Sequence, residues 1–445
     1  MWAGALPLCA DAIDEYVRAR LDSMHVAGVS IAVVKDGAIV KSGGYGAANL
    51  ELHVPATAAT VYRIASLTKP LTAEGVLLLV REGKVDLDAT IDHYLVGTPT
   101  NWKSVTVRQL LQHTSGIVDY LNGVNGGTCN GTTPEEIVAN LGRLPLEFAP
   151  GSRVAYSNSG YLVLGMLLER LGGKRYDLFL QQRIFEPLGM TSTRREDPYE
   201  IIADRAAGYV WIDGRLRNAK PPEPTLVNNA DAGLLSTAPD LARWAISLDK
   251  RQILDERGYR LMETPIQLAD GSTQPWGTGW NIDGANGRRR IWRDGNRADG
   301  SAYIGRYPDQ KLTVIVLTNT SDAHPVTLGN GIAAMYAPEL APSGDATTDP
   351  VPEVTARLRA VLLRFQNGTI DASPFTPEWS SSLPDVANYL KRLFAAGPLR
   401  SLTLSSREAE RPVYHYQAVF GELTVAIDLT LAADGRIHEM SVGAQ

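Results

Sequence analysis

The stretch Ser66-Leu67-Thr68-Lys69 lies where a short predicted strand, 61–64, passes into a predicted helix that stops at Gly83. A serine is a poor nucleophile until a base removes its proton, and a residue three positions later on a helix shares its face. We therefore expect the amine of Lys69 within reach of the Ser66 hydroxyl. Because Ser66 opens the helix, its N–H points outward at the positive helix end, which suits an oxyanion.

The Ser-x-x-Lys pattern occurs a second time, at Ser247-Leu248-Asp249-Lys250. Such a pattern often arises by chance, and a capping serine beside a solvated lysine is its ordinary explanation. Position separates the two copies. Ser247 lies at the end of a predicted helix, whereas Ser66 begins one whose body, Leu71 to Val80, is apolar enough to be buried. We therefore place the chemistry at Ser66.

A tyrosine is the expected partner of this pair, because a lysine acts as a base only when desolvation or a neighbouring group disfavours its protonated form. Tyr156-Ser157-Asn158 lies between a strand-like segment, 153–155, and a predicted helix, 160–171. Tyr120-Leu121-Asn122 has the same spacing but lies in a glycine-rich loop. Either tyrosine taken alone could be an ordinary residue at the edge of an element.

The predicted elements follow the order strands, helices, strands. A branched-chain-rich strand at 29–34 comes early. Late in the domain, extended runs at 277–282, 290–292, 301–306 and 312–317 are separated by turn residues. This order predicts an antiparallel sheet assembled from both ends of a domain, with a helical insertion and a site at the seam. Helices in the insertion are expected at 107–112, 134–141, 160–171, 176–184 and 238–248.

A domain boundary is expected at 337–352, a stretch rich in Pro, Ala and Ser that is typical of a linker. The predicted main domain is therefore 1–336. Residues 353–445 show helices at 352–365 and 384–394 followed by alternating strands, which predicts a small α+β domain.

Composition excludes several classes of function. The chain has 445 residues, 44% hydrophobic and 21% charged, as in folded globular proteins. Its 43 Lys and Arg against 49 Asp and Glu give a net charge of −6 without a long basic run, which argues against nucleic acid as a partner. The longest apolar stretches, such as Tyr161 to Leu168, are shorter than the roughly 20 residues that cross a bilayer, so no membrane span is expected.

Metal and cofactor chemistry have no motif in this sequence. The seven histidines lack ligand spacing, and phosphate-loop, dinucleotide-loop and zinc-protease motifs are missing, so we expect no metal and no cofactor. Cys9 and Cys129 allow at most one disulfide, and whether they pair is open. If the apolar N-terminus, Met1 to Leu8, is the remainder of a signal peptide, the protein is periplasmic or secreted; otherwise it is cytoplasmic.

Five landmarks together resemble the serine β-lactamase and penicillin-binding-protein-like superfamily, most of all class C β-lactamases, family VIII carboxylesterases and D-aminopeptidase-like hydrolases. The resemblance spans about residues 10 to 336 and implies an α/β (α+β) fold, with an antiparallel sheet flanked by helices and a helical subdomain. The landmarks are Ser66-x-x-Lys69, Leu110-Leu111-Gln112-His113-Thr114-Ser115-Gly116, Tyr156-x-Asn158, Ala232-Gly233-Leu234-Leu235-Ser236-Thr237, and the run from Arg306-Tyr307-Pro308-Asp309 to Leu317-Thr318-Asn319.

The resemblance also implies roles for the landmark residues. Ser66 would be the acylated nucleophile and Lys69 the proton acceptor beside it. Tyr156 would be the general base that later activates water. Asn158 would be an amide that orients the substrate.

The third motif of the family, Lys or His, any residue and Gly, departs from its pattern here. The best match is Arg293-Asp294-Gly295. Arginine keeps the positive charge and can hold a carboxylate with two donors, but it does not shuttle protons at neutral pH. If the alignment holds, the N–H of Asn296 is the second oxyanion donor; otherwise Arg293 is a solvated strand residue.

The sequence thus predicts a serine hydrolase that cleaves an ester or amide through an acyl-enzyme on Ser66. An esterase or peptidase is favoured, because Arg293 and the additional C-terminal domain argue against a dedicated antibiotic-resistance enzyme. One alternative is a β-lactamase or DD-peptidase-type penicillin-binding enzyme, and another is a binding or sensor protein without turnover. The expected partner is a small-molecule ester, peptide or β-lactam, and the oligomeric state is left open.

Overall fold

The structure of the chain, a computed structural model, divides into two compact units, Met1–Ala341 and Pro342–Gln445. The linker expected at 337–352 stays a prediction, since 342–350 lie outside the described residues. The structure describes 6–121 (6–11 by backbone only), 133–212, 214–220, 229–285, 288–321, 323–341, 351–369, 371–380, 397–407, 412–421, 423–432, 434–444, and residues 383, 390 and 394.

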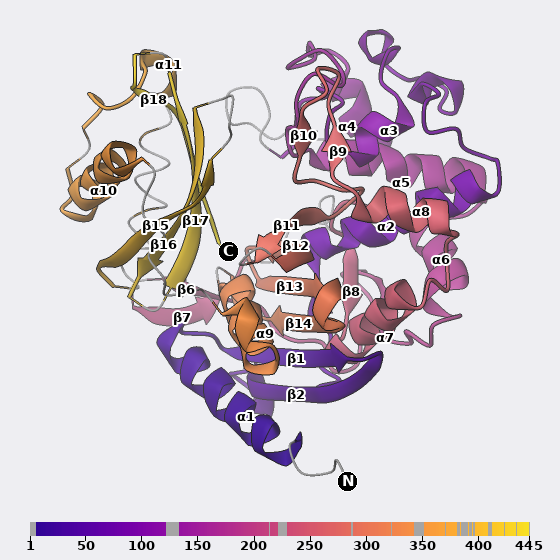
Figure 1. Cartoon of the computed structure of the whole chain (residues 1–445). Coiled ribbons are helices and arrows are strands. Elements are labelled where there is room, and N and C mark those ends of the chain that lie inside the picture. Colours follow the sequence, from indigo (N-terminus) through magenta and orange to yellow (C-terminus); the bar gives the residue numbers. More distant parts are fainter. Residues whose placement is uncertain are drawn as a thin grey trace. The chain divides into compact units, whose positions relative to one another are not determined.

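A seven-stranded antiparallel sheet forms the centre of the first unit, in the order β11-β12-β13-β14-β1-β2-β3. Strand β1, from near the N-terminus, pairs with β14 in a register running from Val29 opposite Thr318 to Lys35 opposite Leu312. Figure 1 shows the indigo β1 and β2 beside the orange β13 and β14. The predicted sheet built from both ends of the domain is therefore confirmed. The strands are β1 (Gly28–Lys35), β2 (Ala38–Asn49), β3 (Val54–Pro55), β11 (Asn281–Ala285), β12 (Arg288–Arg297), β13 (Gly300–Tyr307) and β14 (Leu312–Thr318).

Helices cover both faces of this sheet. Alternate side chains of a strand point to opposite faces, so the side chains of β1 enter two different cores. Val29, Ile31 and Val33 of β1 pack in a core with α1 (Leu6–Ser23) and α9 (Pro325–Tyr336). Ala32 and Val34 belong to a second, larger core with α2 (Thr68–Arg81) and α7 (Ala238–Asp249). With both faces covered, β1 is buried up to its last residue.

The helical region between the two halves of the sheet was predicted in outline. The helices expected at 134–141 and 238–248 are present, and the one expected at 160–171 begins slightly earlier, at Asn158. Helix α8 (Glu256–Glu263) was not predicted. The helices of this region are α2, α3 (Val107–Leu111), α4 (Pro134–Leu141), α5 (Asn158–Gly172), α6 (Tyr176–Leu180), α7 and α8 (Glu256–Glu263).

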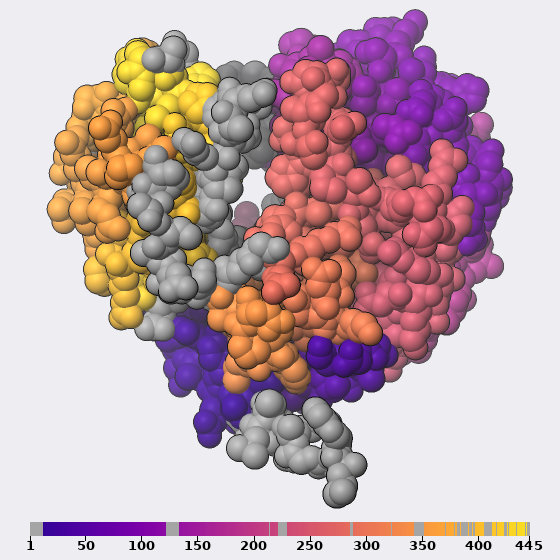
Figure 2. All heavy atoms as spheres, in the orientation of Figure 1, coloured from indigo at the N-terminus to yellow at the C-terminus, as the bar shows by residue number. Residues whose placement is uncertain are grey.

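One predicted strand, 277–282, is wrong over most of its length. A hairpin of β9 (Ile266–Gln267) and β10 (Thr273–Gln274) precedes this segment, and β11 begins only at Asn281. In the bend before β11, Gly279 has φ +83°, and a Cβ on it would lie 2.8 Å from the Cα of Pro70. The backbone therefore passes too close to α2 for an extended strand with side chains. In Figure 2 the salmon hairpin stands at the surface beside the purple helical region.

The second unit is a small α+β unit with a four-stranded antiparallel sheet in sequential order. Leu358 and Leu362 of α10 (Pro352–Gln366) share its core with Tyr416 and Ile427. The helix predicted at 384–394 lies almost entirely outside the described residues. The remaining elements are α11 (Pro377–Ser380), β15 (Leu399–Arg407), β16 (Val413–Phe420), β17 (Leu423–Leu431) and β18 (Ile437–Ala444).

Candidate active site

Ser66 lies on a single helical turn, η1 (Ala65–Leu67), that leads directly into α2. Strand β12 approaches this turn closely at Gly295, where a Cβ would lie 2.3 Å from the carbonyl oxygen of Ile64 and 2.9 Å from the Ser66 nitrogen. Ala65 adopts φ +46°, a left-handed conformation that costs a residue with a side chain about 1–2 kcal/mol. The turn is thus held in a strained form between sheet and helix, as functional turns often are.

Lys69 is fully buried in the first turn of α2, and its ammonium has three acceptors. Its Nζ donates to Ser66 Oγ at 3.2 Å, to Asn158 Oδ1 at 2.7 Å and to the carbonyl oxygen of Asp231 at 3.0 Å. An ammonium has three donors, so every one is used. The structure therefore brings the predicted Ser66 and Lys69 together.

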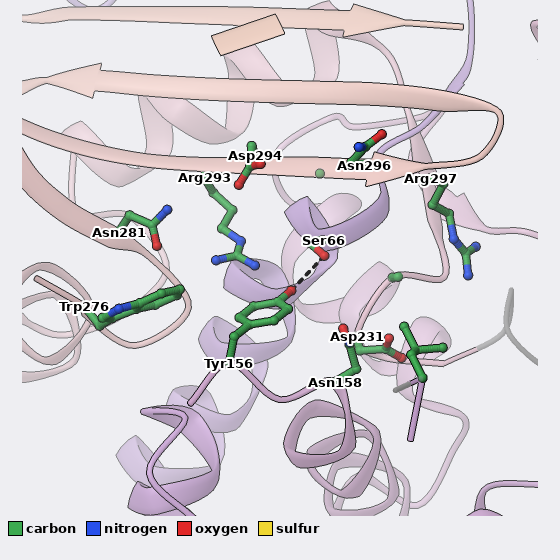
Figure 3. A pocket seen from close by; sticks show the side chains of 13 residues that line it. Ser66, Tyr156, Asn158, Asp231, Trp276, Asn281, Arg293, Asp294, Asn296 and Arg297 are labelled. Carbon is green, nitrogen blue, oxygen red and sulfur yellow. Dashed lines mark hydrogen bonds between the residues drawn. The ribbon is translucent and has the colours of Figure 1, made fainter. Parts of the chain in front are cut away.

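Tyr156 reaches the same serine from the segment before α5. Its hydroxyl donates to Ser66 Oγ at 2.8 Å, as the dashed line in Figure 3 shows. Two cations lie over its ring, Lys69 Nζ at 4.7 Å and Arg293 Cζ at 4.7 Å from the centroid. The phenol therefore lies beside the Ser66 hydroxyl and between two positive charges.

Arg293 projects from β12 into this site and is only 3% exposed, so it is not a solvated strand residue. Its guanidinium also lies 5.7 Å from the ring of Trp276. Its Nε has no hydrogen-bond partner, and no ion pair joins it to a carboxylate in the described part of the chain. A buried cation without a counter-ion is costly, which favours an anionic ligand.

The amide of Asn158 is oriented by Asp119, a residue that the sequence analysis missed. One carboxylate oxygen of Asp119 accepts from the Asn158 side-chain amide at 2.9 Å and from its backbone N–H at 2.6 Å. The other accepts from the N–H of Leu121 at 2.8 Å. Because its NH₂ group is bound in this way, Asn158 presents its carbonyl oxygen to Lys69. Asp119 follows the landmark Leu110 to Gly116 in the sequence. Its closeness to that landmark is the sequence signal that could have identified it.

His113 supports Tyr156 from behind. Its Nδ1 accepts from the N–H of Ser157 at 3.1 Å, and its ring lies 4.7 Å from the ring of Tyr156. Burial, together with the charges of Arg293 and Lys69, lowers the pKa of His113 well below its usual value. A neutral imidazole therefore holds this segment.

In the two alternative motifs, the Tyr120 and Ser247 hydroxyls donate to partners other than Ser66. The Tyr120 hydroxyl donates to Asp231 Oδ2 at 3.0 Å, and burial raises the pKa of Tyr120 well above its usual value. Asn122 lies outside the described residues. In the second Ser-x-x-Lys copy, Ser247 donates to the carbonyl of Trp244 at 2.8 Å while Lys250 is exposed.

A pocket of about 360 Å³ opens onto Ser66, and Tyr156, Asn158 and Arg293 also line it. In the view of Figure 3, Arg293 and Trp276 lie on one side of Ser66, and Asp231 and Arg297 lie on the other. The sequence analysis did not identify Trp276, Asn281, Asp231 or Arg297. The complete lining is Ser66, Leu121, Tyr156, Asn158, Asp231, Ala232, Trp276, Asn281, Arg293, Asp294, Gly295, Asn296 and Arg297.

Within the described part of the chain, no group of three or more His, Cys, Asp and Glu side chains could hold a metal ion. The described helices also include none with the length and hydropathy of a membrane span. Cys129 and the side chain of Cys9 lie outside the described residues, so their pairing stays open.

The sequence model of the Beta-lactamase family matches residues 13–335, most of the chain. The chain belongs to the Beta-lactamase family. The resemblance inferred from the five landmarks is confirmed.

A penicillin-binding protein of Bacillus subtilis (strain 168) is 29% identical over 68% of this chain and 70% of its own. Protein flp of Staphylococcus aureus (strain N315) is 25% identical over 70% of this chain and 63% of its own, so the chain spans less than two thirds of that relative.

Solved structures give the same classification. D-amino acid amidase from Ochrobactrum anthropi SV3 matches with a TM-score of 0.63 and 26% identity, over 75% of this chain and all of that chain. The octameric penicillin-binding protein homologue from Pyrococcus abyssi matches with a TM-score of 0.64 and 24% identity, over 98% of both chains. The latter likeness shows the fold alone. With the family membership, these relatives identify the chain as a serine hydrolase.

Proposed function

We propose that this family member hydrolyses an ester or peptide amide through a covalent acyl-enzyme on Ser66. The observation that carries the proposal is the convergence of two proton-transfer groups on one hydroxyl. Ser66 Oγ lies 2.8 Å from the Tyr156 hydroxyl and 3.2 Å from Lys69 Nζ. Serine attack requires that a neighbouring base take the hydroxyl proton, and both groups are within hydrogen-bond reach.

The environment of Lys69 suits either protonation state. As an ammonium, it donates to Ser66, Asn158 and Asp231. As a neutral amine it has two donors and one lone pair. It can then keep its bonds to Asn158 and Asp231 while the lone pair faces Ser66 Oγ. Asn158 and Asp231 would thus aim the base at the nucleophile.

In the proposed acylation, Ser66 Oγ forms a bond to the substrate carbonyl carbon and its proton passes to the Lys69–Tyr156 pair. Tyr156 then donates a proton to the leaving oxygen or nitrogen as the carbonyl bond to that atom breaks. In deacylation Tyr156 takes a proton from water, which attacks the ester carbon. The Lys69–Tyr156 pair then returns a proton to Ser66 Oγ as the ester bond breaks, which restores the free hydroxyl. Lys69 Nζ, 4.7 Å from the centre of the Tyr156 ring, would stabilise negative charge on the Tyr156 oxygen during these steps.

The oxyanion is proposed to bind the N–H groups of Ser66 and Asn296. The close approach of β12 to η1 at Gly295 supports this pairing, since it brings a strand backbone against the Ser66 nitrogen. Two preorganised N–H donors are the usual means of stabilising a tetrahedral intermediate, and losing one costs about a hundredfold to a thousandfold in kcat.

Fluorophosphonate labelling tests the proposed nucleophile. The intact protein is treated with a fluorescent fluorophosphonate, and the modified residue is located by peptide mass spectrometry. We expect one label, on Ser66, and none in Ser66→Ala. A label on Ser247 would move the nucleophile to the second motif, and an unlabelled protein would favour the binding or sensor function.

Arg293 is proposed to bind a carboxylate on the leaving-group side of the substrate. Replacing it with glutamine removes the cation, and we expect KM for carboxylate-bearing peptides or β-lactams to rise roughly tenfold to a hundredfold, as for loss of a charge-assisted pair. Neutral short-chain esters are the control. A fall in kcat on both substrate types would instead assign Arg293 to the electrostatics of Tyr156 and Lys69.

An esterase or peptidase is favoured over a dedicated β-lactamase. An arginine without a counter-ion at the position of the third motif and the additional C-terminal unit support this preference. The 26% identity to a D-amino acid amidase adds weight to an amide substrate. Comparing kcat/KM on p-nitrophenyl esters, amino-acid anilides and a chromogenic β-lactam decides among the three, and a preference for the β-lactam would reverse the assignment.

A further inference from the structure

The carboxylate of Asp231 is a buried acceptor in the pocket with one oxygen unused. Asp231 lines the pocket and is 1% exposed. Its Oδ2 accepts from the Tyr120 hydroxyl at 3.0 Å, whereas Oδ1 has no hydrogen-bond partner in the described part of the chain. A buried carboxylate oxygen without a donor is destabilising, so this site would be completed by a donor from a ligand.

The proposed mechanism does not use this carboxylate. Lys69 binds the backbone carbonyl of Asp231, at 3.0 Å, and directs its other two donors to Ser66 and Asn158. Burial raises the pKa of Asp231, and the charges of Lys69 and Arg297 act in the opposite direction. A further cation near Oδ1 would favour the ionised carboxylate in the same way.

The position of Asp231 indicates which part of a substrate it would meet. The leaving group must lie near Tyr156, the proposed proton donor, and Figure 3 shows Tyr156 on the same side of Ser66 as Arg293 and Trp276. Asp231 lies on the other side, where the acyl part of the substrate is then expected. Ala232 and Leu121 also line the pocket and offer apolar contact to a substrate.

We propose that Asp231 binds a primary ammonium on the acyl part of the substrate, so that the chain acts on amides or esters of amino acids with a free α-amino group. The inference rests on the proposed function and adds a substrate class to it. Asp231 would contact the substrate directly, through Oδ1, while Tyr120 holds the other oxygen. Selectivity would then come from a charge-assisted hydrogen bond at a desolvated site.

The test compares alanine p-nitroanilide with its N-acetyl derivative, using both enantiomers of each at pH 7, where the free amine is mostly protonated. For the preferred enantiomer, we expect kcat/KM of wild type to be about tenfold or more higher with the free amine, as for one charge-assisted hydrogen bond. In Asp231→Asn this ratio should fall about tenfold, because the amide keeps the shape and loses the charge.

Two further measurements keep the proposal falsifiable if Asp231→Asn folds poorly. The wild-type preference should decline as the pH rises above the pKa of the substrate amine. Tyr120→Phe removes the hydroxyl that donates to Oδ2 but keeps the carboxylate and its charge, so the ratio should fall less than in Asp231→Asn. A wild-type preference for the N-acetyl substrate, or an unchanged ratio in a folded Asp231→Asn, would overturn the proposal. Fluorophosphonate labelling of Ser66 in the wild type and in Asp231→Asn tests the proposed function separately.

Discussion

Replacing Ser66 with alanine is expected to lower kcat/KM on p-nitrophenyl acetate by about a thousandfold or more, as nucleophile removal does in other serine hydrolases. The hydroxyl is a reactant, and its loss leaves Lys69 its bonds to Asn158 and Asp231. The fold should therefore be retained. Initial rates and a thermal melting curve check the two expectations on the same preparation.

Ser247→Ala is the matched control, because it makes the same change in the other Ser-x-x-Lys copy. Ser247 donates to the carbonyl of Trp244 inside α7 and lies outside the pocket lining. Its loss should lower stability by about 1 kcal/mol and leave the turnover rate at the wild-type level. A Ser66→Ala variant that keeps about a tenth of the activity would contradict the assignment of the nucleophile.

The part of the site that the sequence could predict is local or carried by motifs. The spacing of Ser66 and Lys69 on one helix fixes their distance without knowledge of the rest of the chain. Tyr156 and Asn158 were assigned by resemblance. In the structure Tyr156 bonds to Ser66 and Asn158 bonds to Lys69. Arg293 was found by counting back from the Arg306-Tyr307-Pro308 landmark to the best match for the third motif. Its stacking on Tyr156 was not foreseen, because a strand pattern does not give side-chain neighbours.

The other site residues and the order of the strands depend on tertiary contacts, which leave no periodic pattern in the sequence. Trp276 follows the short hairpin β9–β10, whose strands of two residues each are too short to show an alternation. Glu74 lies in the middle of α2 and would be placed on an exposed face by composition. It is fully buried, accepts from Trp244 Nε1 at 2.8 Å, and burial raises its pKa to about 7. The sheet order likewise follows from packing, because alternation identifies β1 and β14 as strands but does not pair them.

Tyr156→Phe is expected to lower kcat on neutral esters by about a hundredfold or more, the usual scale for loss of a positioned proton-transfer group. Phenylalanine keeps the ring, and with it the contacts to His113, Arg293 and Lys69, so the pocket should keep its shape. Only the hydroxyl 2.8 Å from Ser66 Oγ is removed. The effect should therefore appear in kcat and in the pH–rate profile, with little change in KM.

Tyr120→Phe separates this effect from the general cost of deleting a buried phenol oxygen. Tyr120 has the same spacing to an asparagine, but its hydroxyl bonds to Asp231 and not to Ser66. Its loss should lower kcat on a neutral ester far less than Tyr156→Phe does, because no proton transfer passes through it. If Tyr156→Phe turned over at nearly the wild-type rate and Tyr120→Phe did not, Tyr120 would be the base, and the hydrogen bond from Tyr156 to Ser66 would be structural.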